Sequence, residues 1–294
     1  MQAIQELLDA IVTTPWMAAV VVGFVGLCVG SFLNVVIYRM PLMMENEWRN
    51  DCSIILKDQL DPTYTPSYVH MTLSHPASRC PSCAHKIRWY ENIPLVSWLA
   101  LRGRCSACGA SIGARYPIVE LLTLIASLAV LCVFGPTVKM VCALGLTWAL
   151  IALTGIDFDT QLLPDRITLP LAAAGLFVNA QSLFVSPAHA IWGYVIGFLV
   201  LWVVYFIFKI ITGKEGMGYG DFKLLAALGA WLGPMQLPLI ILLSSFVGMI
   251  IGIVLLKVRK ESQPFAFGPY IAIAGWISLM WGNELVTGYL GMYH

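Results

Sequence analysis

The chain has 294 residues, of which 59% are hydrophobic and only 11% are charged, with a net charge of +1 and a mean hydropathy of +0.80. Soluble domains carry about 25% charged residues, so this composition excludes an ordinary soluble globular protein. It predicts an all-α protein that crosses a membrane several times. The net charge says little about partners, and no nucleic-acid partner is expected.

The chain begins without the basic segment of a cleaved signal peptide, and Glu6 and Asp9 precede the first long apolar run. A short amphipathic lead-in helix at the membrane surface is the expected structure there. A membrane span needs about 20 predominantly apolar residues. In chain order, the predicted spans cover residues 16–38, 117–134, 138–156, 167–185, 188–211, 222–232, 237–256 and 268–287.

The segment 222–232 is short, and the distribution of charge decides whether the chain crosses there. With eight spans, 16 of the 17 Lys and Arg residues fall on one side and only Lys139 on the other. Because basic residues gather on the cytoplasmic side, both termini are predicted to be periplasmic. We expect the short span to be tilted, partly re-entrant or shielded by its neighbours.

This topology divides the chain into three parts. Residues 1–40 hold the lead-in and the first span, residues 41–115 form a small cytoplasmic domain, and residues 116–294 form a seven-helix membrane domain. The cytoplasmic domain is thin in core-forming residues, and domains of this size often need a metal or a disulfide to hold them together.

Two Cys-x-x-Cys pairs lie in that domain, Cys80 with Cys83 and Cys105 with Cys108. Their spacing is typical of a four-cysteine zinc ribbon, and Gly103 and Gly109 supply local backbone freedom. Two disulfides or a redox dithiol are the alternatives, but the predicted cytoplasmic side is reducing. We therefore predict a structural Zn²⁺ ion with a closed coordination shell.

Aspartates occur at the ends of two predicted spans, and ionisable groups there mark function. Asp157 continues directly from an apolar helix, and Asp221 follows the turn Gly218-Tyr-Gly220. Structural roles are also open to these acids. Asp165 is expected to cap the next helix and Asp221 could cap its own; Asp159 could face cytoplasmic water, and Lys223 could snorkel to the interface.

The functional interpretation is that Asp157 and Asp221 face each other at the same membrane level. Two carboxyl groups in a partly dehydrated site cannot easily both ionise, so they share one proton. One then activates water as a base while the other polarises a substrate carbonyl group. This is the chemistry of an aspartyl protease, and the neighbouring glycines would let an extended peptide approach closely.

Together the motifs resemble the bifunctional type IV prepilin peptidases, the leader peptidase and N-methyltransferase family of type IV pilus and type II secretion systems. Nearly the whole chain takes part in the resemblance. Its marks, in order, are Gly30-Ser-Phe-Leu-Asn-Val-Val-Ile-Tyr-Arg-Met-Pro41, the four cysteines, Tyr90-Glu-Asn-Ile-Pro-Leu-Val-Ser-Trp98, Arg115-Tyr-Pro-Ile-Val-Glu120, Ile156-Asp-Phe-Asp-Thr-Gln-Leu-Leu-Pro-Asp165 and Gly218-Tyr-Gly-Asp221.

The resemblance implies a GxGD-type intramembrane aspartyl protease of the bacterial inner membrane, surrounded by lipid, with Asp157 and Asp221 as the catalytic pair. Its substrates would be prepilins and pseudopilins, cut on the cytoplasmic side after a basic leader. The new N-terminal residue, usually Phe, would then be methylated with S-adenosylmethionine. Supporting positions would be Asp159, Asp165, Gly218, Gly220 and Lys223. The cysteine domain would be tied to zinc and to methylation.

The methyl-donor site is marked less clearly, because the chain has no Rossmann-type GxGxxG motif and the domain is too small for a Rossmann methyltransferase. Candidates are Glu45, Glu47, Gly103 with Arg104, and the stretch 90–98, and each could equally be structural. The segment 30–39 could form the junction between membrane and loop.

Two other classes of protein remain open from the residues alone. A proton- or cation-coupled transporter also uses membrane carboxylates, but it does not explain the cysteine domain. A non-catalytic assembly scaffold would use that domain to recruit pilus components, but it has no need for paired aspartates.

Overall fold

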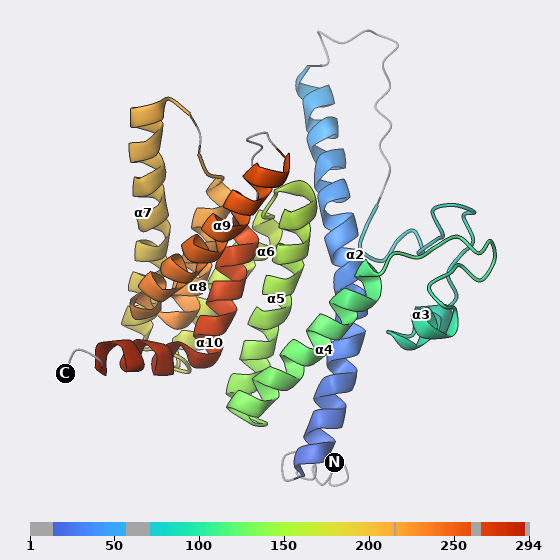
Figure 1. Cartoon of the computed structure of the whole chain (residues 1–294), viewed down its shortest axis with the longest axis horizontal. Helices are drawn as coiled ribbons and strands as arrows, with labels where there is room; N and C mark the ends of the chain where they lie inside the picture. The colour runs from blue at the N-terminus through green and yellow to red at the C-terminus, as the bar shows by residue number, and fades with distance from the viewer. Residues whose placement is uncertain (1–13, 57–70, 215, 260–265, 292–294) are drawn as a thin grey trace. The chain divides into compact units, whose positions relative to one another are not determined.

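The computed structural model describes residues 14–56, 71–214, 216–259 and 266–291. The predicted lead-in helix lies outside these ranges. Regular structure in the described ranges is helical apart from isolated β-bridges (Figure 1). The elements are α2 (Pro15–Ile55), η1 (Trp89–Asn92), α3 (Val96–Ala100), α4 (Arg115–Phe134), α5 (Val138–Thr160), α6 (Asp165–Asn179), α7 (Pro187–Thr212), α8 (Tyr219–Leu232), η2 (Pro234–Gln236), α9 (Leu237–Arg259) and α10 (Gly268–Gly291).

Five helical segments are long and apolar enough to cross a membrane: α2, α4, α5, α7 and Pro234–Ile253, which contains most of α9. The chain is therefore mostly helical, with five candidate spans in its described part. The predicted segments at α6, α8 and α10 are also helices, but they are not among these five. The eight-span count stays a prediction.

Helix α2 continues well past the predicted first span. It has 41 residues and runs through Pro41 to Ile55, which corresponds to about 62 Å at 1.5 Å per residue. A bilayer core is only about 30 Å thick. The helix therefore reaches far into the segment expected to belong to the cytoplasmic domain.

The chain divides into two compact units, residues 1–128 and 129–294. In the first, glycines on α2 allow close approach to α4. A Cβ atom at Gly30 would lie 2.8 Å from the Cα atom of Glu120, and one at Gly26 would lie 2.9 Å from the Oγ atom of Ser127. Small residues at such positions let membrane helices pack backbone to backbone.

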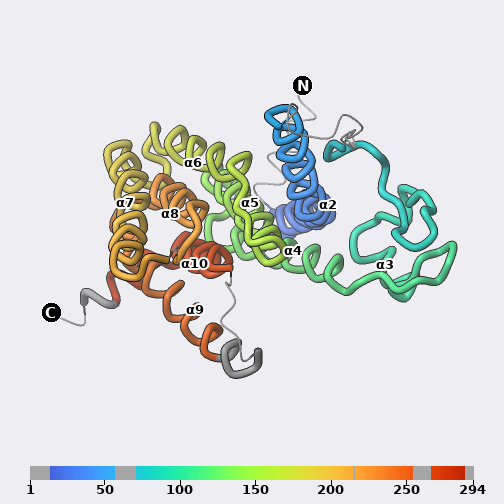
Figure 2. The backbone as a smooth tube through the Cα atoms, turned by 90° about the horizontal axis from the view of Figure 1, so that it is seen from above, coloured from blue at the N-terminus to red at the C-terminus, as the bar shows by residue number. Residues whose placement is uncertain are grey.

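Helix α8 lies at the centre of the second unit. Apart from the half-buried Lys223, its residues from Asp221 to Leu232 are buried. It packs against α6, α7 and α10, and Figure 2 shows it between α7 and α10. A helix that is apolar all round belongs in a core. At 14 residues, about 21 Å, α8 is too short to cross a bilayer alone, and the predicted shielding by neighbours is confirmed.

Helix α6 ends earlier than the predicted span 167–185, and Asn179 explains why. The side-chain amide of Asn179 donates to the carbonyl oxygens of Ala230 (2.8 Å) and Trp231 (3.0 Å) at the end of α8. Its Oδ1 atom accepts from the backbone N–H groups of Phe184 (2.9 Å) and Val185 (3.1 Å) in the following loop. The fully buried residue thus satisfies backbone groups that helix ends leave unpaired.

We predict that Asn179→Ala lowers the free energy of unfolding by about 2–4 kcal/mol, because two buried and two partly buried backbone groups lose a partner. Thermal or denaturant unfolding of the detergent-solubilised protein measures the change. Thr287→Ala is the control, since this exposed hydroxyl group donates to carbonyl oxygens of its own helix, at Asn283 and Glu284, and its loss should cost less than about 0.5 kcal/mol. Equal stability of the two variants would contradict the assignment.

Candidate functional site

Asp157 lies in the last turns of α5, which extends beyond it to Thr160. Only 4% of its surface is exposed, so its carboxyl group is withdrawn from water. The apolar sequence before it explains this position, because the helix carries Asp157 on the same buried face as Leu153 and Ile156.

Asp221 lies in the first turn of α8 and is 7% exposed. The helix begins at Tyr219 with Gly218 as its N-cap residue, and the backbone N–H of Asp221 donates to the carbonyl oxygen of Gly218 at 3.2 Å. The expectation that Asp221 caps the helix is therefore wrong. Its side chain is left available for another role.

The two carboxyl groups are close enough for the charge of Asp157 to act on Asp221. Both parent helices, α5 and α8, pack against α10, so the pair belongs to one compact unit. Two buried carboxyl groups in this arrangement can hold one proton between them. One can then take a proton from water while the other donates to a carbonyl oxygen.

Gly268, the first residue of α10, lies directly beside the carboxyl group of Asp157. A Cβ atom there would lie 2.6 Å from Oδ2 of Asp157 and 3.0 Å from Cδ1 of Leu163. The backbone N–H of Gly268 interacts with the carboxyl group of Asp157, although Oδ2 has no hydrogen bond of ordinary geometry within the described residues. Tyr270, which is 5% exposed, also interacts electrostatically with Asp157.

Gly268 and Tyr270 were not predicted from the sequence. The available signal is the sequence Phe267-Gly-Pro-Tyr270 at the start of an apolar helix, which reads equally well as an ordinary helix start. Of the predicted glycines, Gly220 lies against Leu163, whose Cβ atom would be 2.7 Å from an added Cβ, whereas Gly218 faces open space.

Asp165 and Lys223 join the start of α6 to the first turns of α8. The N-cap residue of α6 is Pro164, so the predicted capping role of Asp165 is wrong. Both carboxylate oxygens of Asp165 instead accept hydrogen bonds from Nζ of Lys223, at 2.7 and 2.8 Å. This pair accounts for Lys223 without snorkelling. Asp159 is exposed, as expected for a residue that faces water.

The first unit brings the four cysteine sulfur atoms together, all within 4.8 Å of one another. The Sγ atoms of Cys80 and Cys108 are 3.9 Å apart, and those of Cys83 and Cys105 are 4.0 Å apart. A tetrahedron with Zn–S bonds of about 2.3 Å has edges of about 3.8 Å. The cluster therefore fits a tetrahedral metal ion.

The two Cys-x-x-Cys pairs lie in two separate loops that have the same pattern of hydrogen bonds. Cys80 donates its backbone N–H to His85 and Cys105 donates to Ala110, at 2.9 and 2.8 Å. The fifth residue of each loop, Ala84 or Gly109, has a positive φ of 58° or 71°. A short β-bridge closes each loop, Arg79 with Lys86 and Arg104 with Ser111.

The two thiols of the first pair have pKa values shifted in opposite directions. The backbone N–H groups of Cys83 and Ser82 lower the pKa of Cys80 to about 6. The backbone N–H of His85 also favours the thiolate of Cys83, but burial and the neighbouring sulfur atoms outweigh it and raise its pKa to about 12. Four thiolates this close repel one another unless a cation lies between them.

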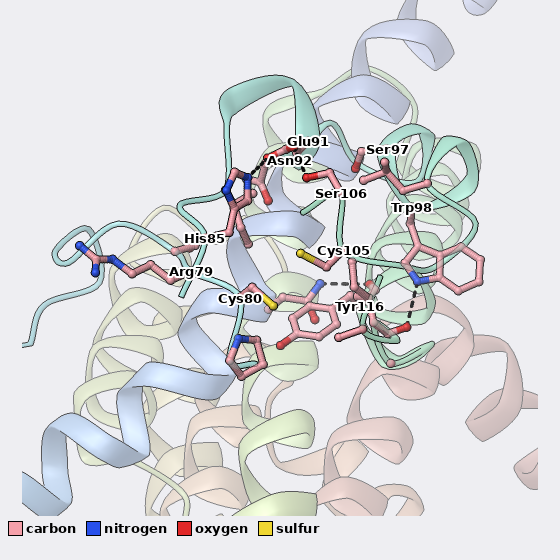
Figure 3. A pocket seen from close by; sticks show the side chains of 18 of the residues that line it. Arg79, Cys80, His85, Glu91, Asn92, Ser97, Trp98, Cys105, Ser106 and Tyr116 are labelled. Carbon is pink, nitrogen blue, oxygen red and sulfur yellow. Dashed lines mark hydrogen bonds and ion pairs between the residues drawn. The ribbon is translucent and has the colours of Figure 1, made fainter. Parts of the chain in front are cut away.

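A cavity of about 310 Å³ lies beside the cysteine cluster (Figure 3). Figure 3 shows Glu91 between His85 and Ser106, with Oγ of Ser106 2.6 Å from Oε1 of Glu91. The backbone N–H of Arg88 also donates to Glu91 and, with Ser106, lowers the pKa of that carboxyl group. The segments that line the cavity are 31–39 of α2, 78–87, 91–98, 101–113 and 116–120 of α4.

Only some of the residues predicted to bind the methyl donor line this cavity. The stretch 90–98 and the segment 30–39 both contribute to the cavity lining, whereas Glu45, Glu47, Gly103 and Arg104 do not. Glu45 pairs with Arg49 on an exposed face of α2 at 2.6 Å. Gly103 has a φ of 65° and packs against the indole ring of Trp98. A role of these four residues in methyl transfer stays a prediction.

Comparisons with known proteins cover most of the chain. Residues 24–134 match the bacterial peptidase A24 N-terminal domain, and residues 144–253 match the type IV leader peptidase family. No solved structure matches.

Curated relatives are similar over nearly their whole length. A protein from Stutzerimonas stutzeri is 53% identical over 90% of this chain and 91% of its own. Proteins from Aeromonas hydrophila and Pseudomonas aeruginosa are 52% and 51% identical, over 94% and 97% of this chain and 95% and 97% of their own. All three are named prepilin leader peptidase/N-methyltransferase. The chain belongs to the type IV leader peptidase family.

Proposed function

We propose that the chain cleaves the basic leader from type IV prepilins and type II secretion pseudopilins, and then methylates the new N-terminal residue with S-adenosylmethionine. The observation that carries the peptidase half is the pair Asp157 and Asp221. Two carboxyl groups from different helices are each more than nine-tenths buried in one compact unit, and the charge of Asp157 acts on Asp221. Burying two such groups together costs folding free energy. Buried carboxyl pairs of this kind are therefore typical of catalytic sites.

In this mechanism, one carboxylate takes a proton from water as the water oxygen attacks the scissile carbonyl carbon. The protonated partner donates to the carbonyl oxygen, which gives a neutral tetrahedral intermediate. Collapse of this intermediate returns a proton to the departing amine, which becomes the mature N-terminus. Gly220 and Gly268 let the backbones of α8 and α10 approach Leu163 and Asp157 closely, and the open space at Gly218 leaves room for an extended substrate backbone beside the first turn of α8.

The membrane arrangement is part of the proposal. Eight spans, with periplasmic termini in the bacterial inner membrane, put Asp157 and Asp221 at the cytoplasmic ends of their helices. A prepilin has its basic leader in the cytoplasm and its apolar helix in the lipid, so its scissile bond would lie at that depth. Residues 41–115 are then the cytoplasmic domain and residues 116–294 the membrane domain.

We assign the four-cysteine cluster to Zn²⁺. Cys80, Cys83, Cys105 and Cys108 supply a complete set of thiolate ligands, so the ion would hold the domain together and leave no position open for substrate.

Replacing either aspartate with asparagine should abolish proton transfer in the pair and slow leader cleavage by more than about 100-fold. The measurement is mass spectrometry of a purified prepilin incubated with Asp157→Asn or Asp221→Asn enzyme in detergent. Glu284→Gln, which removes an exposed carboxyl group elsewhere, should cleave normally. Wild-type cleavage by either aspartate variant would rule out the assigned pair.

Gly268→Ala should reduce kcat for cleavage by about 10- to 100-fold, because the new Cβ atom displaces Asp157 or Leu163 and misplaces the carboxyl group. The matched control is Gly288→Ala in the same helix, where an added Cβ meets no atom within 4 Å. Steady-state kinetics with one prepilin compare the two variants. Equal kcat values would show that α10 does not shape the site.

Metal analysis of the purified protein should find one zinc ion per chain, and Cys105→Ser should lose it. Cys52→Ser is the control, because Cys52 is an exposed thiol outside the cluster. Unchanged zinc in Cys105→Ser would refute the ligand set, and a different metal in the wild type would refute the assignment to zinc.

A further inference from the structure

The geometry points to the cavity beside the cysteine cluster as the place of methyl transfer, with Glu120 as the group that receives the substrate amine. This inference rests on the proposed function, because it assigns the N-methylation step to a site. The ligands of this site would be cationic: an α-ammonium group together with the sulfonium end of the methyl donor.

Glu120 is a buried carboxyl group that lines the cavity and is only 8% exposed. Its Oε2 atom accepts from the backbone N–H of Leu95 at 2.8 Å, and the hydroxyl group of Ser31 also interacts with the carboxyl group. Within the described residues, no ion pair joins Glu120 to a basic side chain. A buried carboxylate with neutral partners favours a cationic ligand, because an unpaired buried charge is costly.

Two arginines also line the cavity, and Figure 3 shows the side chain of Arg79 pointing away from it. The other arginine is bound elsewhere. The guanidinium group of Arg39 donates to the carbonyl oxygens of Thr72, Leu73 and Pro76, at 3.0, 3.4 and 2.7 Å. Arg39 therefore ties α2 to the loop of residues 72–76 and is not the partner of Glu120. The rest of the lining supplies aromatic rings from Tyr38, Trp98 and Tyr116, which suit ammonium and sulfonium cations.

Backbone strain marks the same place. Leu95 has φ 57° and ψ −46°, and the N–H of Val96 bonds to the carbonyl oxygen of Pro94 at 2.6 Å. This is a γ-turn of the positive-φ kind, which is rare and strained. The strained residue is the one whose N–H holds Glu120. Strain that persists beside a cavity is typical of functional sites.

The space suits the reacting ends of two molecules. The cavity of about 310 Å³ adjoins a second one of about 420 Å³, and the two share His85, Glu91, Ser97, Leu101 and Ser106. Ligand pockets commonly occupy about 300–1,000 Å³. The amine and the methyl group can therefore meet beside Glu120 while the remainder of the donor extends into the neighbouring space.

The α-ammonium group of the cleaved pilin gives a proton to the Glu120 carboxylate and becomes a neutral amine. The nitrogen lone pair forms the N–CH₃ bond as the S–CH₃ bond breaks, and sulfur keeps the bonding electron pair. The products are an N-methylammonium group and the neutral thioether S-adenosylhomocysteine, and the proton on Glu120 passes to water.

Glu120→Gln keeps an acceptor oxygen for Leu95 but cannot take the proton. We expect it to methylate at least about 100-fold more slowly at saturating S-adenosylmethionine while cleaving the prepilin at the wild-type rate, and Glu120→Asp to recover part of the loss. Mass spectrometry of one pilin reads cleavage and the added methyl group together. Glu284→Gln should match the wild type in both. Methylation by Glu120→Gln within threefold of the wild type would overturn the inference.

A second variant tests the cavity while leaving Glu120 in place. Gly113 lines the cavity, and a Cβ atom there meets nothing within 4 Å, so Gly113→Leu should fold, fill the cavity and slow methylation at least tenfold with normal cleavage. Gly145→Leu, at an exposed position with equally open space, should leave both activities unchanged. If Glu120→Gln loses cleavage or metal, Gly113→Leu decides, and normal methylation by it overturns the inference. A wild-type enzyme that cleaves without methylating would instead refute the methyltransferase half of the proposed function.

Discussion

The withdrawal of two carboxyl groups from water is the constraint on which the second unit depends. A carboxylate without water or partners is costly, so Asp157 and Asp221 persist only where the surrounding helices hold them firmly. Helix α8 provides this support because its neighbours enclose it on all sides, so that even a 14-residue helix can be buried. Its last carbonyl groups are satisfied by Asn179 rather than by water.

Close helix packing is the means by which this burial is achieved. At Gly193 and Gly229 the backbones of α7 and α8 touch, and a Cβ atom on either residue would overlap the other helix. The same device joins α2 to α4 in the first unit through Gly26 and Gly30. In both units, small residues let the backbones of two helices approach more closely than bulky side chains would allow.

Features with local signals could be predicted from the sequence. The cysteine cluster follows from ligand spacing, and the buried aspartates follow from their position at the ends of apolar runs. The helices were located for the same reason, since apolar runs and their polar boundaries are visible in one dimension. Their ends were less predictable, because α6 stops where Asn179 finds partners 51 and 52 residues later in the chain. The pairing of Asp165 with Lys223 could not be predicted either, because the two residues are 58 positions apart in the chain. Gly268 and the strained turn at Leu95 depend on what lies opposite them, and no short motif records that.

The two cysteine loops each carry their own backbone hydrogen bonds, and no backbone hydrogen bond joins one loop to the other within the described ranges. A bound ion would therefore be the principal cross-link between them. Both loops also contribute walls to the cavity that contains Glu120. The distance between those walls would then be set by bond lengths to a metal, which vary far less than contacts between side chains. The size of the ion would therefore set the width of the cavity. Replacing it by a larger thiolate-binding ion such as Cd²⁺ would move the two walls apart without any change of sequence.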